Sequence, residues 1–491
     1  MENYEWFLSG IIVIPIVGTL VLLIWRKATK KQAATIGIIS ESFALAIPLV
    51  LLSVLRRNDQ IVFSLPWIQN MGISFRLSLN WLCLIFLLTE VLVTLTAMIY
   101  SLGEETGEKN SNFYYALLLL FSLGMSGTTL ADDAFLFYIF WELMLVASVL
   151  LILIWGYGET RFRVALKYFI VTHLGSLMVL VCLITLFVNF GTANISDWMM
   201  QANSLAINTQ VLLIIFFIVG FSVKMAIFPL HIWLPDAHTV APMPVTIILA
   251  AAMLSMGTYG ILRFPFALFP LENLQPFAIW MMIAGLISEV YGALMALAEK
   301  DIKRIIAFSS VSQMGYIIFG LGSLTLRGME GAIMHVVYHA IIKALLFMVV
   351  GIIVAVTSER DIQNISGLGF KYPILCVCAA IGVLGISGMP PLGIFNSEWM
   401  IFAGGFDSGV SIALTIIVLI GSLLTVIYAL RFFGNIFFGD RKPESLPQKA
   451  PLALILPTLV ITIFLIVEGL TPGPLLTWAM KGLTSFIGGL H

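Results

Sequence analysis

Long runs of apolar residues recur along the whole chain and decide its fold class. A run of about 20 apolar residues is long enough to cross the hydrocarbon core of a bilayer as a helix. The pattern therefore predicts an all-α polytopic membrane protein with about 14 transmembrane helices. The predicted spans are 7–25, 33–55, 77–100, 113–131, 134–156, 163–190, 209–235, 242–264, 276–298, 303–323, 329–356, 373–401, 408–433 and 451–472.

Two segments differ from this helical pattern. The stretch IVFSLPWIQNMGISFRLS (61–78) has strand-type residues on both sides of Asn-Met-Gly, so it predicts an extramembrane hairpin. The first apolar run, Phe7 to Trp25, has no basic stretch before it and no small-residue cleavage site after it. It is predicted to be a retained span and not a cleaved signal.

The composition agrees with a membrane protein and excludes several functions. The chain is 60% hydrophobic and 10% charged, and its mean hydropathy is +1.05. The net charge of −1, without a basic patch, gives no reason to expect a nucleic-acid partner. The four cysteines lie in apolar runs without C-x-x-C, and neither G-x-G-x-x-G nor a P-loop occurs. We therefore expect no cofactor and no metal in this chain.

Lysine and arginine are distributed unevenly between the predicted loops. Loops with odd numbers, counted from the N-terminus, hold most of them. Loops with even numbers hold only Arg56, Arg57, Arg76, Arg263 and Arg327. Because basic residues favour the cytoplasmic side, this bias predicts a multi-pass protein of the cell (cytoplasmic) membrane with both termini outside.

Several ionisable residues lie inside predicted spans. The lysines are Lys224 and Lys343, and the acids are Glu41, Glu90, Glu142, Glu289 and Glu398. A charge at the bilayer centre costs about 2.5–3.5 kcal/mol on insertion scales, so such residues usually face a polar interior and mark ion paths. The alternative is that they form structural ion pairs that hold helices together.

Glu142 and Lys224 are the clearest pair among these residues. Glu142 lies in the fifth predicted span, and Lys224 lies midway along the seventh. Neither charge can be buried cheaply unless the two meet. Contact with Glu142 would keep Lys224 protonated, and separation would let it release its proton.

Prolines interrupt one span in each half of the chain. Pro229 and Pro235 break the seventh span, and Pro390 and Pro391 break the twelfth shortly before Glu398. Such breaks are tolerated where protein or a water-filled cavity satisfies the freed backbone groups, and they occur at ion sites of transporters. Simple packing kinks are the alternative. A proline-interrupted span in each half is what an internal repeat would produce.

His335, His339 and Lys343 are spaced by four residues and therefore share one helix face. This polar stripe suits proton transfer because imidazole titrates near neutral pH. A zinc site is the alternative, but no H-E-x-x-H motif and no third ligand supports it. His173 is interpreted as a structural core histidine. Asp132 and Asp133 are interpreted as the turn between two spans.

Four motifs together resemble the antiporter-like subunits of the complex I superfamily. They are KMAIFPLHIWLPDAH (224–238), KDIKRIIAFSSVSQMGY (300–316), HAIIKALLF (339–347) and GMPPLGIFNSEW (388–399). Such subunits occur in NADH–quinone oxidoreductase, F420H2 dehydrogenase, membrane-bound hydrogenase and sulfane reductase, and in Mrp antiporters. The resemblance covers roughly residues 77–440.

This resemblance implies two inverted five-helix repeats with broken seventh and twelfth helices. The implied division is 1–110 for three N-terminal spans with the hairpin, 111–265 and 270–435 for the repeats, and 436–491 for the last span and tail. By position, Glu142 and Lys224 match the glutamate and lysine of the fifth and seventh helices. Lys343 and His339 match the polar stripe of the eleventh helix, and Glu398 matches the ionisable residue near an exit.

The chain departs from its relatives at two positions. Many relatives have a lysine in the eighth helix where Ser255 stands, so a central relay would depend on water, His231 or His238. Gln313 stands where M-type subunits often have histidine, which points toward L-type and hydrogenase-type chains, whereas Glu398 points toward the M-type. The placement among L-, M- and Mrp-type subunits stays open.

We therefore expect a proton-translocating, or sodium-translocating, subunit of a redox-driven respiratory membrane complex. The candidate residues are Glu142, Lys224, Lys343, His339, His335 and Glu398, with His231, His238, Ser255 and Glu289 as further candidates. Other antiporter-like and small membrane subunits, peripheral redox subunits and lipid are the expected partners, with iron–sulfur clusters or other redox cofactors on the partner subunits. A redox-independent Mrp-type Na⁺/H⁺ antiporter subunit and a transport-inactive scaffold are the alternatives.

Overall fold

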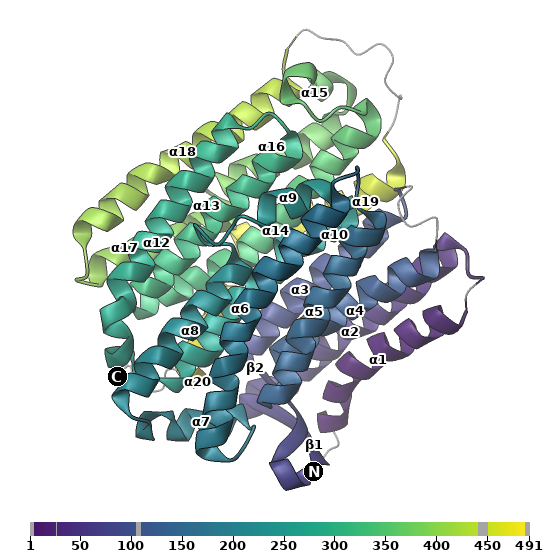
Figure 1. Ribbon diagram of the computed structural model, residues 1–491. Coiled ribbons are helices and arrows are strands. Elements are labelled where there is room, and N and C mark those ends of the chain that lie inside the picture. Colours follow the sequence, from purple (N-terminus) through teal and green to yellow (C-terminus); the bar gives the residue numbers. More distant parts are fainter. Residues whose placement is uncertain (1–3, 26, 105–109, 440–449, 487–491) are drawn as a thin grey trace.

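The computed structural model describes residues 4–25, 27–104, 110–439 and 450–486, which form a bundle of membrane-crossing helices (Figure 1). In this part of the chain, 13 helices are long and apolar enough to cross a membrane. They are α1 (Tyr4–Ile24), α2 (Lys30–Asn58), α3 (Trp81–Ser101), α4 (Ser111–Leu130), α5 (Ala134–Trp155), α6 (Arg161–Phe190), α8 (Ile207–Met225), the continuous segment Met243–Phe266, α12 (Leu271–Ala298), α13 (Ile302–Gly322), α14 (Leu326–Thr357), α18 (Ile412–Phe437) and α19 (Leu452–Leu470). The all-α fold class is confirmed.

One further crossing, the twelfth along the chain, is the predicted broken helix of the second half, which brings the total to 14. It consists of α16 (Pro373–Ile386) and α17 (Gly393–Asp407), with Pro390 and Pro391 in the turn between them. The seventh crossing is broken in the same way, because α8 ends at Met225 and α9 (Leu234–Val240) follows a non-helical turn. Both helix breaks that the prolines predict are therefore present.

The eighth crossing is continuous but irregular. It contains α10 (Met243–Ile248) and α11 (Leu254–Ile261), each followed by one π-helical stretch, Leu249–Met253 and Leu262–Phe266. The whole segment is buried inside the bundle. π-Helical turns are rare and often occur at functional sites.

The shorter elements lie between the crossings. The predicted hairpin forms as two antiparallel strands, with Phe63 opposite Leu77 in their register. These elements are β1 (Gln60–Ile68), η1 (Gln69–Met71), β2 (Ile73–Asn80), α7 (Ile195–Gln201), η2 (Ala202–Ser204), η5 (Ile362–Asn364), α15 (Leu368–Lys371) and α20 (Gly473–Phe486).

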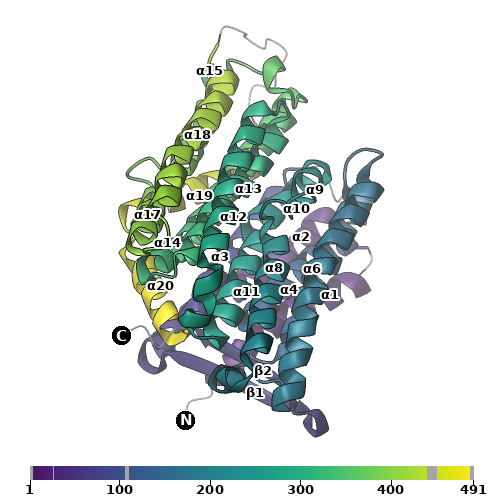
Figure 2. The ribbon, with the colours of Figure 1, turned by 60° about the vertical axis from the view of Figure 1, so that its left-hand side comes forward.

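Both described ends of the chain lie on the hairpin side of the bundle. Trp6 of α1 packs edge-to-face against Phe63 of β1, with ring centroids 5.0 Å apart, and the ring of Trp478 of α20 lies 6.3 Å from that of Trp81, which directly follows β2. Figures 1 and 2 show α20 at this end. Because the number of crossings is even, both ends must lie on the same side of the membrane.

The two halves share a local pattern that reveals an internal repeat. Asp133 caps the N-terminus of α5 and bridges Asn194, and Asp301 caps α13 and bridges Asp361. In each half the cap precedes the second helix, and the bridge partner follows the third. Because each half contains five crossings, the second copy runs in the opposite direction through the membrane. The exact limits of the repeats stay a prediction.

The longest helix, α14, joins the parts of the bundle. It packs against α13, α16 and α17 of its own half and also against α3, α19 and α20. Residues 328–353 of this helix are buried throughout. Figure 2 shows α14 between the outer helices of the second half and the N-terminal helices. Its polar residues consequently lie in the protein interior, away from lipid.

Candidate functional site

The break in the seventh crossing is enclosed by protein. The indole N–H of Trp233 donates to the Val223 carbonyl at 3.0 Å, which satisfies one acceptor at the end of α8. The backbone N–H of Phe228 donates to the Ser288 hydroxyl of α12 at 2.9 Å. Since Ser288 belongs to the second half, the broken helix is held by both halves.

Lys224 lies in the last turn of α8, immediately before this break. Its side chain is buried, and its ammonium group has no hydrogen-bond partner among the described residues. The Nζ atom lies 5.1 Å from the centroid of the Trp141 ring. The C-terminal end of a helix and an aromatic face both favour a positive charge. These two features stabilise the ammonium without a carboxylate contact.

Glu142 pairs with a residue that the sequence interpretation assigned to the structural core. Its Oε2 atom lies 3.2 Å from Nδ1 of His173 on α6. Within the described residues, no ion pair of 4.0 Å or less joins Glu142 to Lys224. The predicted direct contact is therefore not formed. Trp141 faces Lys224, and consecutive helical residues point about 100° apart, so Glu142 is directed toward α6.

The interpretation of His173 as a satisfied core residue was wrong. Its side chain is 35% exposed, and that of Glu142 is 21% exposed. The His173 ring also stacks on Phe169, one turn earlier in α6, at 5.3 Å. The pair lies close to Lys224, near enough for the charge of Glu142 to act on the ammonium group.

The polar stripe of α14 is completely buried. His335, His339 and Lys343 have no exposed surface. The Lys343 ammonium donates to the Ile306 carbonyl at 3.0 Å and to the Ser309 hydroxyl, both on α13. One stripe residue is therefore fixed directly to the neighbouring helix.

The two histidines of the stripe differ in their contacts. The ring of His335 lies 3.1 Å from the Ser397 hydroxyl of α17 and 3.0 Å from the amide oxygen of Gln313 on α13. Both ring nitrogens of His339 lack a partner among the described residues. His335 is thus held between two helices, whereas His339 can accept or donate a proton without breaking a protein hydrogen bond.

Glu398 is placed by the break in the twelfth crossing. It is 7% exposed and lies on α17, one residue after the partner of His335. Gly388 in the break has a φ of +65°, and a Cβ atom there would lie 2.3 Å from Oε2 of Glu398. The positive φ favours glycine, and a Cβ atom here would force the carboxyl group to move. The backbone of the break therefore packs directly on this carboxyl group.

Glu289 on α12 lies near the same exit region. Its Oε1 atom accepts a hydrogen bond from the Tyr316 hydroxyl at 3.0 Å, and its Oε2 atom has no partner among the described residues. Gly421 of α18 packs against this carboxyl group. Glu289 and Glu398 are near enough for their charges to interact. The structure thus brings Glu289 beside the predicted exit.

The candidate relay residues between the halves have few polar contacts. His238 on α9 is fully buried, both of its ring nitrogens lack partners in the described chain, and its ring lies 5.5 Å from Phe347 of α14. His231 packs between Phe228 and Tyr291. The Ser255 hydroxyl donates to the Ala251 carbonyl of its own helix at 3.0 Å. The His238 ring thus packs against α14, one turn beyond Lys343 of the stripe.

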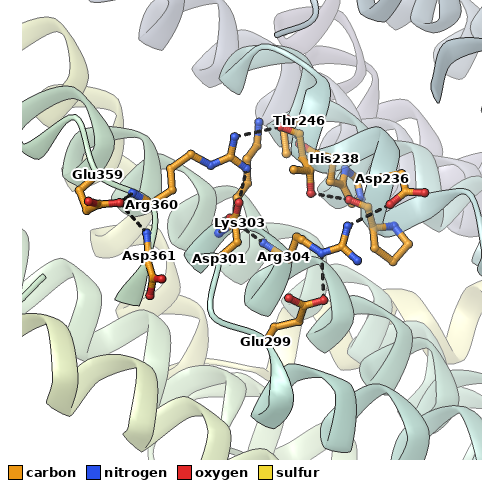
Figure 3. Close-up of polar contacts among 12 residues, drawn as sticks. Asp236, His238, Thr246, Glu299, Asp301, Lys303, Arg304, Glu359, Arg360 and Asp361 are labelled. Atoms are coloured by element: carbon orange, nitrogen blue, oxygen red, sulfur yellow. Dashed lines mark hydrogen bonds and ion pairs between the residues drawn. The ribbon is translucent and has the colours of Figure 1, made fainter. Parts of the chain in front are cut away.

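Lys303, the first residue of the predicted span 303–323, was not among the candidate residues, but its side chain is buried. Its ammonium donates to the Ala241 carbonyl, directly after α9, at 2.6 Å (Figure 3). Asp301 caps the start of α13 and turns Lys303 inward. The positive charge thus lies beside His238, close enough to interact with it. The K-D-I-K-R pattern, with aspartate as a helix cap, is the signal that could have placed Lys303 inside the bundle.

Ion pairs connect the break in the seventh crossing to neighbouring helices. Asp236 of α9 accepts from Lys167 of α6 and Arg304 of α13, each at 2.9 Å. Arg360 pairs with Asp301 at 2.7 Å in the same region (Figure 3). Neighbouring Glu359 accepts backbone N–H groups of Asp361 and Arg360, which lowers the pKa of its exposed carboxyl group.

Asp132 has a different role from the simple turn that was predicted. It is fully buried and pairs with Arg76 of β2 at 2.8 Å and with Arg263 of the eighth crossing at 2.5 Å. Ser196 also donates to it at 2.8 Å. This cluster fastens the hairpin to the bundle. Arg76 and Arg263 belong to the even loops, where basic residues are scarce, and this was the sequence signal that could have pointed to the cluster.

The described residues contain no group of three His, Cys, Asp or Glu side chains that could hold a metal ion. The four cysteines form no disulfide in this part of the chain. The chemistry that the arrangement supports is proton binding and release by buried amines, imidazoles and carboxyl groups arranged across both halves.

Comparison with known proteins establishes the family. The family model described as NADH:quinone oxidoreductase/Mrp antiporter, TM, matches residues 131–425, which is more than half of the chain. The chain belongs to the NADH:quinone oxidoreductase/Mrp antiporter transmembrane family. NADH-quinone oxidoreductase subunit M of Escherichia coli K12 is 34% identical over 430 residues, covering 84% of this chain and 82% of that protein.

Two solved structures have the same fold. A chain of the Mrp complex from Dietzia sp. DQ12-45-1b has a TM-score of 0.89 and 21% identity, covering 100% of this chain and 98% of that chain. A chain of the membrane-bound sulfane sulfur reductase, an archaeal respiratory membrane complex, has a TM-score of 0.88 and 27% identity, covering 96% and 77%. Chains of two different membrane complexes therefore have the same architecture as this chain.

Proposed function

We propose that the chain is a proton-translocating, antiporter-like subunit of a redox-driven membrane complex. The observation that carries this proposal is the set of buried ionisable groups at both helix breaks and along α14: Lys224, His339, Lys343 and Glu398. Buried ionisable groups in membrane spans are costly and usually mark ion paths. The family and the 34% identity to NADH-quinone oxidoreductase subunit M support the redox-driven form of the proposal.

The first half would work as an electrostatic switch. In the structure, Glu142 contacts His173, and Lys224 rests against Trp141. Rotation of the Glu142 side chain from His173 toward Lys224 would add a carboxylate beside the ammonium and hold the proton there. Return of Glu142 to His173 would weaken that hold and release the proton toward the centre of the protein.

The second half would receive the proton and pass it outward. His238 lies between the two halves, and His339 and Lys343 follow on α14. The hydrogen bonds of Lys343 to Ser309 and of His335 to Gln313 and Ser397 lead along α13 to α17, which carries Glu398. Glu398, with Glu289 close by, would release the proton on the other side.

The transported ion is a proton because the central group is an amine. An ammonium group repels Na⁺ and offers no acceptor atom to bind it. The imidazole groups of His238 and His339 likewise suit protons, since an imidazole ring can accept a proton at one nitrogen and donate one from the other. Sodium transport by carboxylate oxygens elsewhere in the chain is the alternative outcome of the test below.

The chain would act within a larger assembly. We propose other antiporter-like and small membrane subunits as its neighbours, and peripheral redox subunits that carry the iron–sulfur clusters. The bias of lysine and arginine toward odd loops supports an arrangement in the cell membrane with both termini outside. A redox event in a partner would shift the Glu142 switch, and about 2.3 kcal/mol would move one charge against 100 mV.

Replacement of Lys224 by methionine in the intact complex tests the proposal. Met keeps the length and apolar volume of the side chain but cannot hold a proton. We expect proton uptake by inverted membrane vesicles, per electron from the donor, to fall, while sodium uptake stays unchanged. Lys481→Met is the matched control, because Lys481 also lies over a tryptophan ring, that of Trp81 at 4.4 Å, but is exposed on α20.

The results separate the alternatives. Proton uptake that is normal in Lys224→Met would refute transport through this site and favour a scaffold. A loss of sodium-dependent uptake without a redox donor would favour the Mrp-type antiporter.

A further inference from the structure

Two fully buried acids lie outside the path described above. Glu41 is on α2 and Glu90 is on α3, and their exposed fractions are 0% and 1%. Glu41 Oε1 and Glu90 Oε1 have no hydrogen-bond partner in the described part of the chain. Neither acid forms an ion pair with a described Lys, Arg or His residue. An ionised form of either acid would therefore be an uncompensated buried charge, so each carboxyl group can store a proton.

A row of hydroxyl groups on α4 lies between the two acids and contacts one acid at each end. Ser122, Ser126 and Thr129 are spaced by four and three residues, so they share one helix face. Ser122 donates to Oε2 of Glu41 at 3.0 Å, and Thr129 donates to Oε2 of Glu90 at 3.3 Å. Ser126 lies between them and next to Glu90. A hydroxyl group can accept a proton on one side and give up its own on the other.

The row ends at the irregular eighth crossing. The Thr129 carbonyl accepts a hydrogen bond from the Tyr259 hydroxyl of α11 at 2.6 Å, and the Thr129 hydroxyl lies 3.7 Å from the Met256 sulfur. Met256 directly follows Ser255, the position where the family resemblance implies a lysine. Glu90 therefore lies beside the segment that lacks its expected ionisable group.

We propose that Glu41 and Glu90 are a proton-binding pair that exchanges protons through the α4 hydroxyl groups and serves the eighth crossing in place of the lysine absent at Ser255. This inference rests on the proposed proton translocation. A purely structural role, in which the acids only hold α2 and α3 to α4, is the alternative. A neutral glutamine amide would fill that structural role equally well, because it has the same size and hydrogen-bonds the same hydroxyl groups.

Glu90→Gln and Glu41→Gln in the intact complex distinguish these roles. We expect about 100-fold slower proton uptake in vesicles for each variant, the scale of losing a positioned proton-transfer group. We expect Glu90→Asp to restore most of the rate, because it keeps the acid. Glu468→Gln is the control, since this half-buried acid on α19 also has an unpartnered oxygen atom but forms no hydrogen bond with the α4 hydroxyl groups among the described residues.

Infrared difference spectra of the working complex provide an independent readout. The C=O stretching band of a protonated carboxyl group should change during turnover and should be absent in Glu90→Gln. Normal uptake in both glutamine variants, or the same carboxyl band in wild type and variants, would overturn the proposal. If one variant does not assemble, the other decides, because the proposal requires both acids.

Lys224→Met separates this inference from the proposed function. If Lys224→Met stops proton uptake and the glutamine variants do not, only the role of the acid pair fails. If Lys224→Met has no effect, the proposed translocation fails first.

Discussion

Gly388→Ala is expected to impair proton release because a side chain at this position would displace the Glu398 carboxyl group. The φ of Gly388 is +65°, which costs a non-glycine residue about 1–2 kcal/mol. The new Cβ would lie 2.3 Å from Oε2 of Glu398, whereas ordinary contacts begin at 3.4 Å. The carboxyl group must therefore move by about 1.1 Å, and a displacement of about 1 Å can slow a positioned reaction about 100-fold.

Gly409→Ala separates the two effects of this substitution. Gly409 has nearly the same φ, +66°, but a Cβ there would meet nothing within 4 Å. Both variants should lower the melting temperature of the purified complex, because alanine is strained at this positive φ. Only Gly388→Ala should slow proton uptake by energised vesicles. Equal uptake rates in the two variants would refute the placement of Glu398 on the proton path.

Two further substitutions test neighbouring parts of the structure. Gly421→Ala places a Cβ 2.5 Å from the Glu289 carboxyl group and should slow proton uptake. Gly434→Ala, on the same helix, meets nothing within 4 Å and should leave proton uptake unchanged. Equal uptake rates in the two variants would contradict a role for Glu289 in proton release. Arg263→Met leaves the buried carboxylate of Asp132 with one fewer partner and should destabilise the subunit by about 3–5 kcal/mol, measured by thermal denaturation. A loss of stability below about 1 kcal/mol would contradict the role of the Asp132 cluster in anchoring the hairpin.

The sequence predicted the crossings well because apolar length is a strong signal. The hairpin and both broken helices were also predictable, since Asn-Met-Gly and the paired prolines have direct conformational consequences. The positions of Lys343 and His335 on one buried face followed from their spacing. These features depend on residues that are close in the sequence, so the local sequence pattern is enough to predict them.

Pairing between distant helices could not be predicted in the same way. The sequence suggested Glu142 opposite Lys224, but the rotation of α5 directs Trp141 to the lysine and Glu142 to His173. The burial of Lys303 depends on the cap formed by Asp301. Such contacts are decided by helix rotation and by caps, which hydropathy does not record.

A double-mutant cycle at Glu142 and Lys224 tests the central claim most directly. Protons translocated per electron would be measured for the wild type, Glu142→Gln, Lys224→Met and the double variant. If Glu142 acts only by holding and releasing the proton on Lys224, the double variant should equal Lys224→Met alone. Losses that multiply, so that the double variant falls below both single variants, would contradict a shared switch.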